Sequence, residues 1–112
     1  MRLKSDIWVA ALLRRCQSQG LYGAIILKGA GEAGAVYVII NHLNGTCDLL
    51  QPAPGPAYDE EGERRFVKAS TTAITLHEAY SILQRHRKFD ADIWEVEIED
   101  REGLAGLTPE II

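Results

Sequence analysis

The sequence predicts an α+β fold: a mainly antiparallel sheet of about five strands with two helices packed on one face, in the order α-β-β-β-β-α-β. Three observations predict it. An amphipathic stripe lies near the N-terminus, several β-branched runs are separated by turn residues, and a helix-capping sequence precedes an alternating run. Strands that follow one another directly, with helical segments before and after them, are typical of α+β domains.

Length and composition limit the possibilities further. The 112 residues are expected to form a single domain over residues 1–112. The formal net charge of −4 argues against binding to nucleic acid through its phosphates. No apolar run reaches the roughly 18 residues of a membrane span, so no membrane association is predicted. Because nothing in the chain indicates export, Cys16 and Cys47 are expected to be free thiols in the cytoplasm.

The first element is expected to be a helix over residues 5–19. Ser5 is a suitable N-cap, and Gly20 is a suitable stop. The apolar side chains that form its single stripe are Trp8, Val9, Leu12, Leu13 and Cys16. The stripe predicts that one side of this helix packs on the sheet.

Two strands are expected next, at residues 22–28 and 35–41. The loop between them, 29–34, matches the G-x-G-x-x-G pattern of dinucleotide-binding proteins. A β-branched run follows this loop in place of the helix whose N-terminus would hold a pyrophosphate. We therefore interpret the loop as a hairpin connection. Asn44-Gly45 then predicts a tight turn into a third strand at 46–51.

The second half of the chain begins with an irregular stretch. Residues 52–64 hold three prolines and two glycines, which excludes a central strand, and a short strand is expected at 65–69. Thr75 and Glu78 spell a capping box and predict a helix over 76–88. A strand is expected over 93–99, and a short last strand at 104–107.

Three carboxylates share one face of the strand at 93–99. On a strand, Glu95, Glu97 and Glu99 would follow one another at intervals of about 7 Å. The simplest interpretation is a solvated face; a docking edge for a basic partner and a metal or catalytic role are the alternatives. Because no His or Asp cluster lies nearby in the sequence, we predict no metal ligands.

The sequence contains no complete catalytic motif and no basic cluster of the kind that binds nucleic acid. His77-Glu78 lacks the second histidine of H-E-x-x-H, because residue 81 is serine. No G-x-S-x-G motif exists, and neither cysteine lies beside a histidine. The basic groups at 14–15 and 85–88 lack the interleaved aromatic residues that stack on bases. We predict no catalytic residue, no cofactor and no nucleic-acid partner, and we favour a non-enzymatic role.

The loop at 52–64 is the remaining candidate site. Long loops in small domains are uncommon and are often functional or disordered. Tyr58, Asp59 and Arg64 could order over a ligand or a partner. A mobile loop without a function is the other interpretation.

The two ends of the chain resemble a known family. The matching segments are Met1–Val9, Phe89–Trp94 and Glu97–Gly103, with further similarity at 34–36 and 52–58 and none at 62–74. The chain resembles a bacterial family of uncharacterised proteins, domain of unknown function fourteen ninety-one, over most of its length. The resemblance implies a small cytoplasmic bacterial protein and supplies no functional residues.

The apolar pattern of the first two strands suggests how the protein acts. Both strands are apolar at nearly every position, which indicates cover on both faces, and the two helices are expected to shield only one. We therefore predict an interaction domain that buries its second sheet face, or an edge, in a homodimer or against another protein. The alternative is a small-molecule-binding protein or enzyme with its site at the 52–64 loop.

Overall fold

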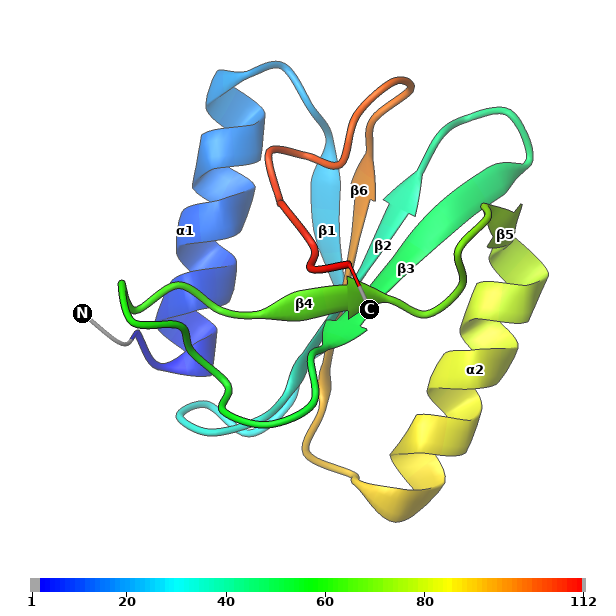
Figure 1. Cartoon of the computed structure of the whole chain (residues 1–112). Helices are drawn as coiled ribbons and strands as arrows, with labels where there is room; N and C mark the ends of the chain where they lie inside the picture. Colours follow the sequence, from blue (N-terminus) through cyan, green and yellow to red (C-terminus); the bar gives the residue numbers. More distant parts are fainter. Residues whose placement is uncertain (1–2, 112) are drawn as a thin grey trace.

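The structure is a computed structural model that describes residues 3–111; Met1 and Arg2 of the N-terminal motif, and Ile112, lie outside this range. In chain order the elements are α1 (Ser5–Ser18), β1 (Gly23–Leu27), β2 (Val36–Asn41), β3 (Thr46–Pro52), β4 (Phe66–Lys68), β5 (Ile74–Thr75), α2 (Leu76–Phe89) and β6 (Trp94–Glu99) (Figure 1). The α+β class is confirmed, and the element order differs from the prediction only by the two-residue β5.

The sheet is mixed, with strand order β1-β6-β2-β3-β4 and β5 paired with β3. β6 runs parallel to β2, where Val36 faces Trp94, and antiparallel to β1, where Ile25 faces Val96. The predicted hairpin between the first two strands is therefore wrong, because β6 lies between them. The predicted hairpin between β2 and β3 is confirmed.

The glycine-rich segment before β2 serves a different purpose from a hairpin turn. It wraps around the start of β6, where the backbone N–H of Ala30 donates to the carbonyl of Asp92 (3.0 Å). The indole N–H of Trp94 donates to the carbonyl of Ala30 (2.7 Å). A Cβ added at Gly34 would lie 2.2 Å from the Asp92 carbonyl oxygen. Glycine is needed here because two backbones approach closely.

The two helices cover opposite faces of the sheet, so the prediction that both pack on one face is wrong. Alternate residues of a strand point to opposite faces. Val36, Val38 and Ile40 of β2 join the core cluster of α1, whereas Tyr37 and Ile39 join that of α2. The apolar residues along β2 therefore find cover on both sides within one chain, and one helix supplies each cover.

The two helices begin differently. The capping box of α2 is confirmed: the hydroxyl of Thr75 accepts from the N–H of Glu78, and the Glu78 carboxylate accepts from the N–H of Thr75. In α1 the N-cap is Lys4, not Ser5 as predicted. Ser5 is buried in the first turn, and its hydroxyl donates to the carbonyl of Gly34. The Ser5 hydroxyl therefore forms a tertiary hydrogen bond to Gly34 and does not cap the helix.

The chain after β6 forms turns and no strand at 104–107. Ala105 of this segment is buried in the core cluster of α1, and Glu110 forms an isolated parallel bridge with Val67. Within residues 3–111, no helix has the length and apolar character that a membrane span requires.

Candidate functional site

The predicted loop at 52–64 is held in place by its own backbone. The N–H of Ala53 donates to the carbonyl of Arg65, and the N–H of Arg65 donates to the carbonyl of Ala57, both at 3.0 Å. Tyr58 and Arg64 form an antiparallel bridge. The loop is therefore a folded excursion whose two arms pair with each other.

Asp59 organises the tip of this loop. Its carboxylate accepts from the backbone N–H groups of Glu61 and Glu63, both at 2.9 Å. Asp and Asn side chains commonly stabilise turns in this manner. The geometry thus assigns Asp59 a local structural role, whereas Tyr58 and Arg64 point back toward α1.

Arg64 reaches from the loop to the start of α1. Its Nη2 donates to the hydroxyl of Ser5 (2.8 Å), and its Cζ lies 5.6 Å from the ring centre of Trp8 and 5.1 Å from that of Tyr58. The hydroxyl of Tyr58 donates to the carbonyl of Leu3 (2.6 Å). Two aromatic rings and a hydroxyl fix the direction of the guanidinium.

The neighbouring Arg65 is bound in a different manner. Its Nε and Nη2 donate to the two carboxylate oxygens of Glu110 at 2.6 and 2.8 Å. Its Nη1 donates to the carbonyls of Pro54 and Pro56 at 3.0 and 2.8 Å. Such a bidentate pair is a specific and comparatively strong contact. Arg65 therefore closes the loop onto the C-terminal segment.

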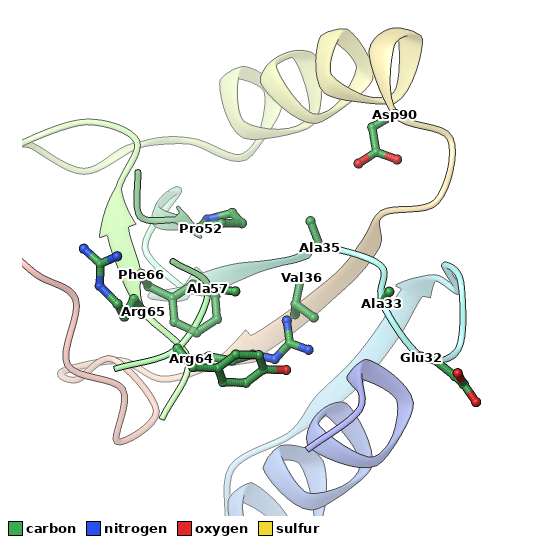
Figure 2. A pocket seen from close by; sticks show the side chains of 11 residues that line it. Glu32, Ala33, Ala35, Val36, Pro52, Ala57, Arg64, Arg65, Phe66 and Asp90 are labelled. Carbon is green, nitrogen blue, oxygen red and sulfur yellow. The ribbon is translucent and has the colours of Figure 1, made fainter. Parts of the chain in front are cut away.

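A cavity of about 370 Å³ lies between this loop and the connection before β2. Its lining is mainly apolar, with Ala33, Ala35, Val36, Pro52, Ala57 and Phe66, and its polar members are Glu32, Tyr58, Arg64, Arg65 and Asp90. Figure 2 shows Arg64 beside Val36, and Asp90 approaching from the end of α2. Small-molecule sites commonly combine an apolar lining with a few polar groups in this manner.

The three predicted carboxylates of β6 lie on the α2 side of the sheet, away from this cavity. Glu95 is only 1 % exposed and accepts from Nη1 of Arg87 at 2.6 Å. Glu97 accepts from the hydroxyl of Tyr80 and from the side-chain amide of Asn41. The prediction of a solvated face is wrong for Glu95, because α2 covers this part of β6.

The structure therefore brings Tyr58 and Arg64 together and separates them from Glu95, Glu97 and Glu99. Ser5, Trp8 and Phe66 complete the surroundings of Arg64, and sequence reasoning assigned none of them to a site. Ser5 and Trp8 lie 59 and 56 positions from Arg64, so only the packing of the loop on α1 reveals them. Phe66 lies two positions from Arg64 on β4, where an apolar residue is typical of a core strand and gives no sign of a site. Residues 3–111 contain no group of three or more His, Cys, Asp or Glu side chains placed to hold a metal ion.

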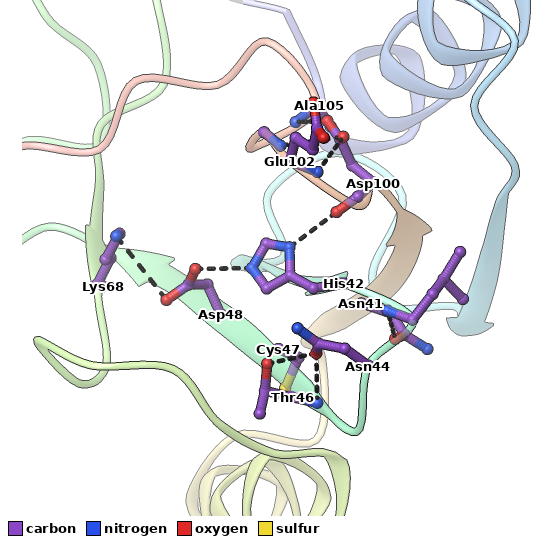
Figure 3. Close-up of polar contacts among 12 residues, drawn as sticks. Asn41, His42, Asn44, Thr46, Cys47, Asp48, Lys68, Asp100, Glu102 and Ala105 are labelled. Carbon is purple, nitrogen blue, oxygen red and sulfur yellow. Dashed lines mark hydrogen bonds and ion pairs between the residues drawn. The ribbon is translucent and has the colours of Figure 1, made fainter.

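A second polar centre links β2, β3 and the turn after β6. Figure 3 shows His42 between Asp48 and Asp100. Its Nδ1 lies 2.7 Å from the carbonyl oxygen of Asp100, and its Nε2 lies 2.9 Å from Oδ2 of Asp48. Both neighbours are acceptors, so both ring nitrogens must donate, which describes an imidazolium. Burial opposes this charge, but the hydrogen bonds to Asp48 and Asp100 outweigh burial and raise the pKa of His42.

Asp100 in turn anchors the chain that follows it. Partial burial opposes its charge, but the backbone N–H groups of Ala105, Gly103 and Glu102 donate to the carboxylate and lower its pKa. The His42 centre therefore has a structural function, because each of its groups is engaged with the chain itself.

This geometry predicts a pH dependence of stability. A raised folded-state pKa means that the contribution of His42 is complete below its unfolded value, about 6.5. The contribution is then lost as the pH rises through the folded-state pKa. We expect the free energy of unfolding, measured with urea, to fall as the pH rises above about 6.5. His42→Gln should flatten this slope, whereas His77→Gln, which alters an exposed histidine, should leave it unchanged. An equal slope in His42→Gln would contradict the assignment.

Comparisons with known proteins agree with this fold. A family model described as "Protein of unknown function (DUF1491)" matches residues 3–108. The chain is similar to the crystal structure of a DUF1491 family protein from Caulobacter crescentus, with 36 % identity, a TM-score of 0.78 and 96 % of each chain covered. It is also similar to the solution structure of a protein from A. tumefaciens, with 40 % identity, a TM-score of 0.79 and coverage of 92 % of this chain and 90 % of that one. None of the curated proteins compared with the chain matches it.

Proposed function

The chain belongs to the DUF1491 family, and we propose from its structure that it is a non-enzymatic protein-interaction domain that pairs through the free edge of β1. In the simplest case the partner is a second copy, and the product is a homodimer. We propose further that it works as one domain over residues 1–112, in the cytoplasm of a bacterium.

The observation that carries this proposal is the apolar character of the β1 edge. Among residues 3–111, β1 pairs with β6 alone, so its other edge has unpaired backbone groups. Ile25 and Ile26 are 44 % and 45 % exposed, and Tyr22 is 67 % exposed. Residues 21–27 carry no charge. Exposed edges are usually protected by charged residues or proline, because they otherwise pair with another strand.

A bulge in β1 explains why two adjacent isoleucines are exposed. The pairing passes from Ile25 opposite Val96 to Leu27 opposite Glu95, so Ile26 is an extra residue. The bulge places Leu27 on the face of Glu95 and leaves Ile26 outside the regular alternation. Both isoleucines are therefore available to a partner that lies along this edge.

The charges at the two ends of β1 favour a second copy as the partner. In a two-fold antiparallel pair the same segment meets itself in reverse. Lys28 follows the strand at one end; at the other end Tyr22 accepts a hydrogen bond from the N–H of Glu99 and lines a hollow with Asp100 and Glu102. Lys28 of one copy would therefore face the acidic end of the other. Glu99 is the predicted partner-binding carboxylate that fits this arrangement.

Neither face of β2 is left uncovered within one chain, which differs from the prediction. An uncovered sheet face was predicted from the apolar pattern of β2, but α1 and α2 cover β2 from opposite sides. Ile39, on the α2 side of β2, is fully buried within one chain. The predicted alternative, an exposed sheet edge, is present at β1 and supports the interaction proposal.

The state of the two thiols supports the proposed non-enzymatic role and the proposed cytoplasmic location. Burial, with the nearby Asp48, Glu97 and Glu78 charges, raises the pKa of Cys47 to about 11, so the thiol is protonated at neutral pH and a poor nucleophile. Cys16 and Cys47 are free and lie in clusters on opposite faces of the sheet. They cannot bridge within one chain, which fits a reducing compartment.

Sedimentation equilibrium tests the β1 edge. We expect a dimer at micromolar concentration for the unaltered protein and a monomer for Ile25→Lys/Ile26→Lys, with an unchanged far-UV spectrum. Phe89→Lys, which alters another strongly exposed apolar residue, should remain dimeric. A monomeric unaltered protein over this range, or a dimer that survives the double substitution, would contradict the homodimer.

A second candidate function is small-molecule binding at the 52–64 loop, favoured by the cavity of about 370 Å³ beside Arg64. Tyr58 and Arg64 would then be binding residues. A thermal-shift screen of small compounds tests it, with Ala57→Phe as a variant that fills the cavity from its exposed lip. The second candidate fails if no compound stabilises the protein in a manner that Ala57→Phe abolishes.

A further inference from the structure

Arg64 is a positive charge without a counterion among residues 3–111. Its guanidinium contacts the hydroxyl of Ser5 and the rings of Trp8 and Tyr58, and no carboxylate of the described residues lies within ion-pair distance. Arg65, one residue on, is paired in full with Glu110. Partly buried cations are ordinarily paired, because burial without a counterion costs free energy.

The guanidinium also has an unused donor. Nε of Arg64 is buried and has no hydrogen-bond partner in the described part of the chain. A buried donor left in this state costs about 1–3 kcal/mol. Burial lowers the pKa of Arg64, and Tyr58 opposes this effect only in part. An arginine remains protonated in spite of such a shift, so the site favours an anion.

The position of the guanidinium is set before any ligand arrives. The loop bridge between Tyr58 and Arg64 fixes the backbone, and Ser5, itself buried and bonded to Gly34, fixes one end of the side chain. The rings of Trp8 and Tyr58 restrict the remaining freedom. A pre-positioned group loses little entropy on binding, which increases affinity.

The cavity beside Arg64 defines the rest of the ligand. Val36 and Phe66 are buried beneath it and offer apolar contact, as does Ala57. Glu32 also belongs to the lining, but its carboxylate pairs with Nζ of Lys4 at 2.9 Å. Asp90 contributes a second negative charge to the lining. These acidic groups disfavour a ligand with two or more negative charges, and the chain as a whole carries a net charge of −4.

We propose that this cavity binds a small organic monocarboxylate, whose carboxylate group pairs with the guanidinium of Arg64 while its apolar body lies against Val36 and Phe66. The proposal rests on the second candidate function and specifies the class of its ligand. Arg64 is the recognition residue because its planar fork matches a carboxylate.

Valerate and valeramide test the proposal, because they share an apolar body and differ in charge. Titration calorimetry at constant ionic strength should detect saturable binding of valerate and at least about tenfold weaker binding of valeramide. Arg64→Gln should weaken valerate binding by about tenfold or more and leave valeramide unaffected. Arg64→Lys should retain part of the affinity, and Arg85→Gln, which removes an exposed arginine elsewhere, should retain all of it.

Three outcomes would overturn the carboxylate proposal: equal binding of valerate and valeramide, tighter binding of inorganic phosphate than of valerate, or unchanged valerate binding in a folded Arg64→Gln. The loss of both ligands in Ala57→Phe, combined with no effect of Arg64→Gln, would retain the small-molecule site and reject its anionic ligand. Failure of every compound, including the uncharged ones, would reject the site itself.

Discussion

Replacing Arg87 with leucine is expected to lower the free energy of unfolding by about 3 kcal/mol. The substitution leaves Glu95, which is 1 % exposed, without the cation that lies 2.6 Å from its carboxylate. Breaking a buried pair in this manner costs about 3–5 kcal/mol. We expect the lower end of that range, because Arg87 itself is partly exposed. Urea denaturation followed by circular dichroism measures the change.

The double variant Arg87→Leu/Glu95→Leu distinguishes two causes of the lost stability: the unpaired buried carboxylate of Glu95 and the lost packing of the Arg87 side chain. It should recover most of the lost stability, because no unpaired carboxylate remains beneath α2. Arg85→Leu, on the exposed side of the same helix, should change stability by less than about 0.5 kcal/mol. If the double variant is no more stable than Arg87→Leu, the unpaired charge is not the cause.

Gly34→Ala is expected to lower the free energy of unfolding by about 3 kcal/mol, the upper end for overpacking at a dense site. The added methyl group would lie 2.2 Å from the carbonyl oxygen of Asp92 and 3.0 Å from Cδ1 of Trp94. A backbone oxygen cannot rotate away as a side chain can. The segment before β2 would have to move off the start of β6, which weakens the contacts of Ala30 with Asp92 and Trp94.

Gly31→Ala provides the matched control from the same segment. Its added Cβ would meet only Oδ2 of Asp6, at an ordinary distance of 3.7 Å. We expect a change within about 0.5 kcal/mol in urea denaturation. Equal destabilisation by both alanines would show that this segment needs glycine for flexibility and not for close contact with β6.

The same glycines explain why the local sequence predicted a hairpin that the fold does not contain. A glycine-rich stretch between two apolar runs is typical of a hairpin. The local pattern contains nothing that distinguishes a hairpin from a connection that passes over an intervening strand. The distinction depends on β6, about 60 residues later in the chain. Its insertion between β1 and β2 becomes visible only when Trp94 and Asp92 meet Ala30.

The candidate site also combines residues that the sequence predicted with residues that it did not. Tyr58 and Arg64 were identifiable because they lie in a long loop of a short chain, and the structure places both beside a cavity. Ser5 was expected to cap α1 and instead holds Arg64 and Gly34. A serine hydroxyl serves either purpose equally well, so sequence alone cannot choose between them.

The α+β class, the capping box of α2 and the hairpin at Asn44-Gly45 could be predicted from the sequence, because each depends on residues within a few positions of one another. Three features become visible only in the folded chain: α1 and α2 cover opposite faces, β6 lies inside the sheet, and Glu95 is buried beside Arg87. These features could not be predicted because the burial of side chains and the pairing of strands and charges depend on contacts between segments that are far apart in the sequence. The apolar pattern of a strand indicates that a face of the sheet is buried, but it does not identify the helix or strand that packs on that face.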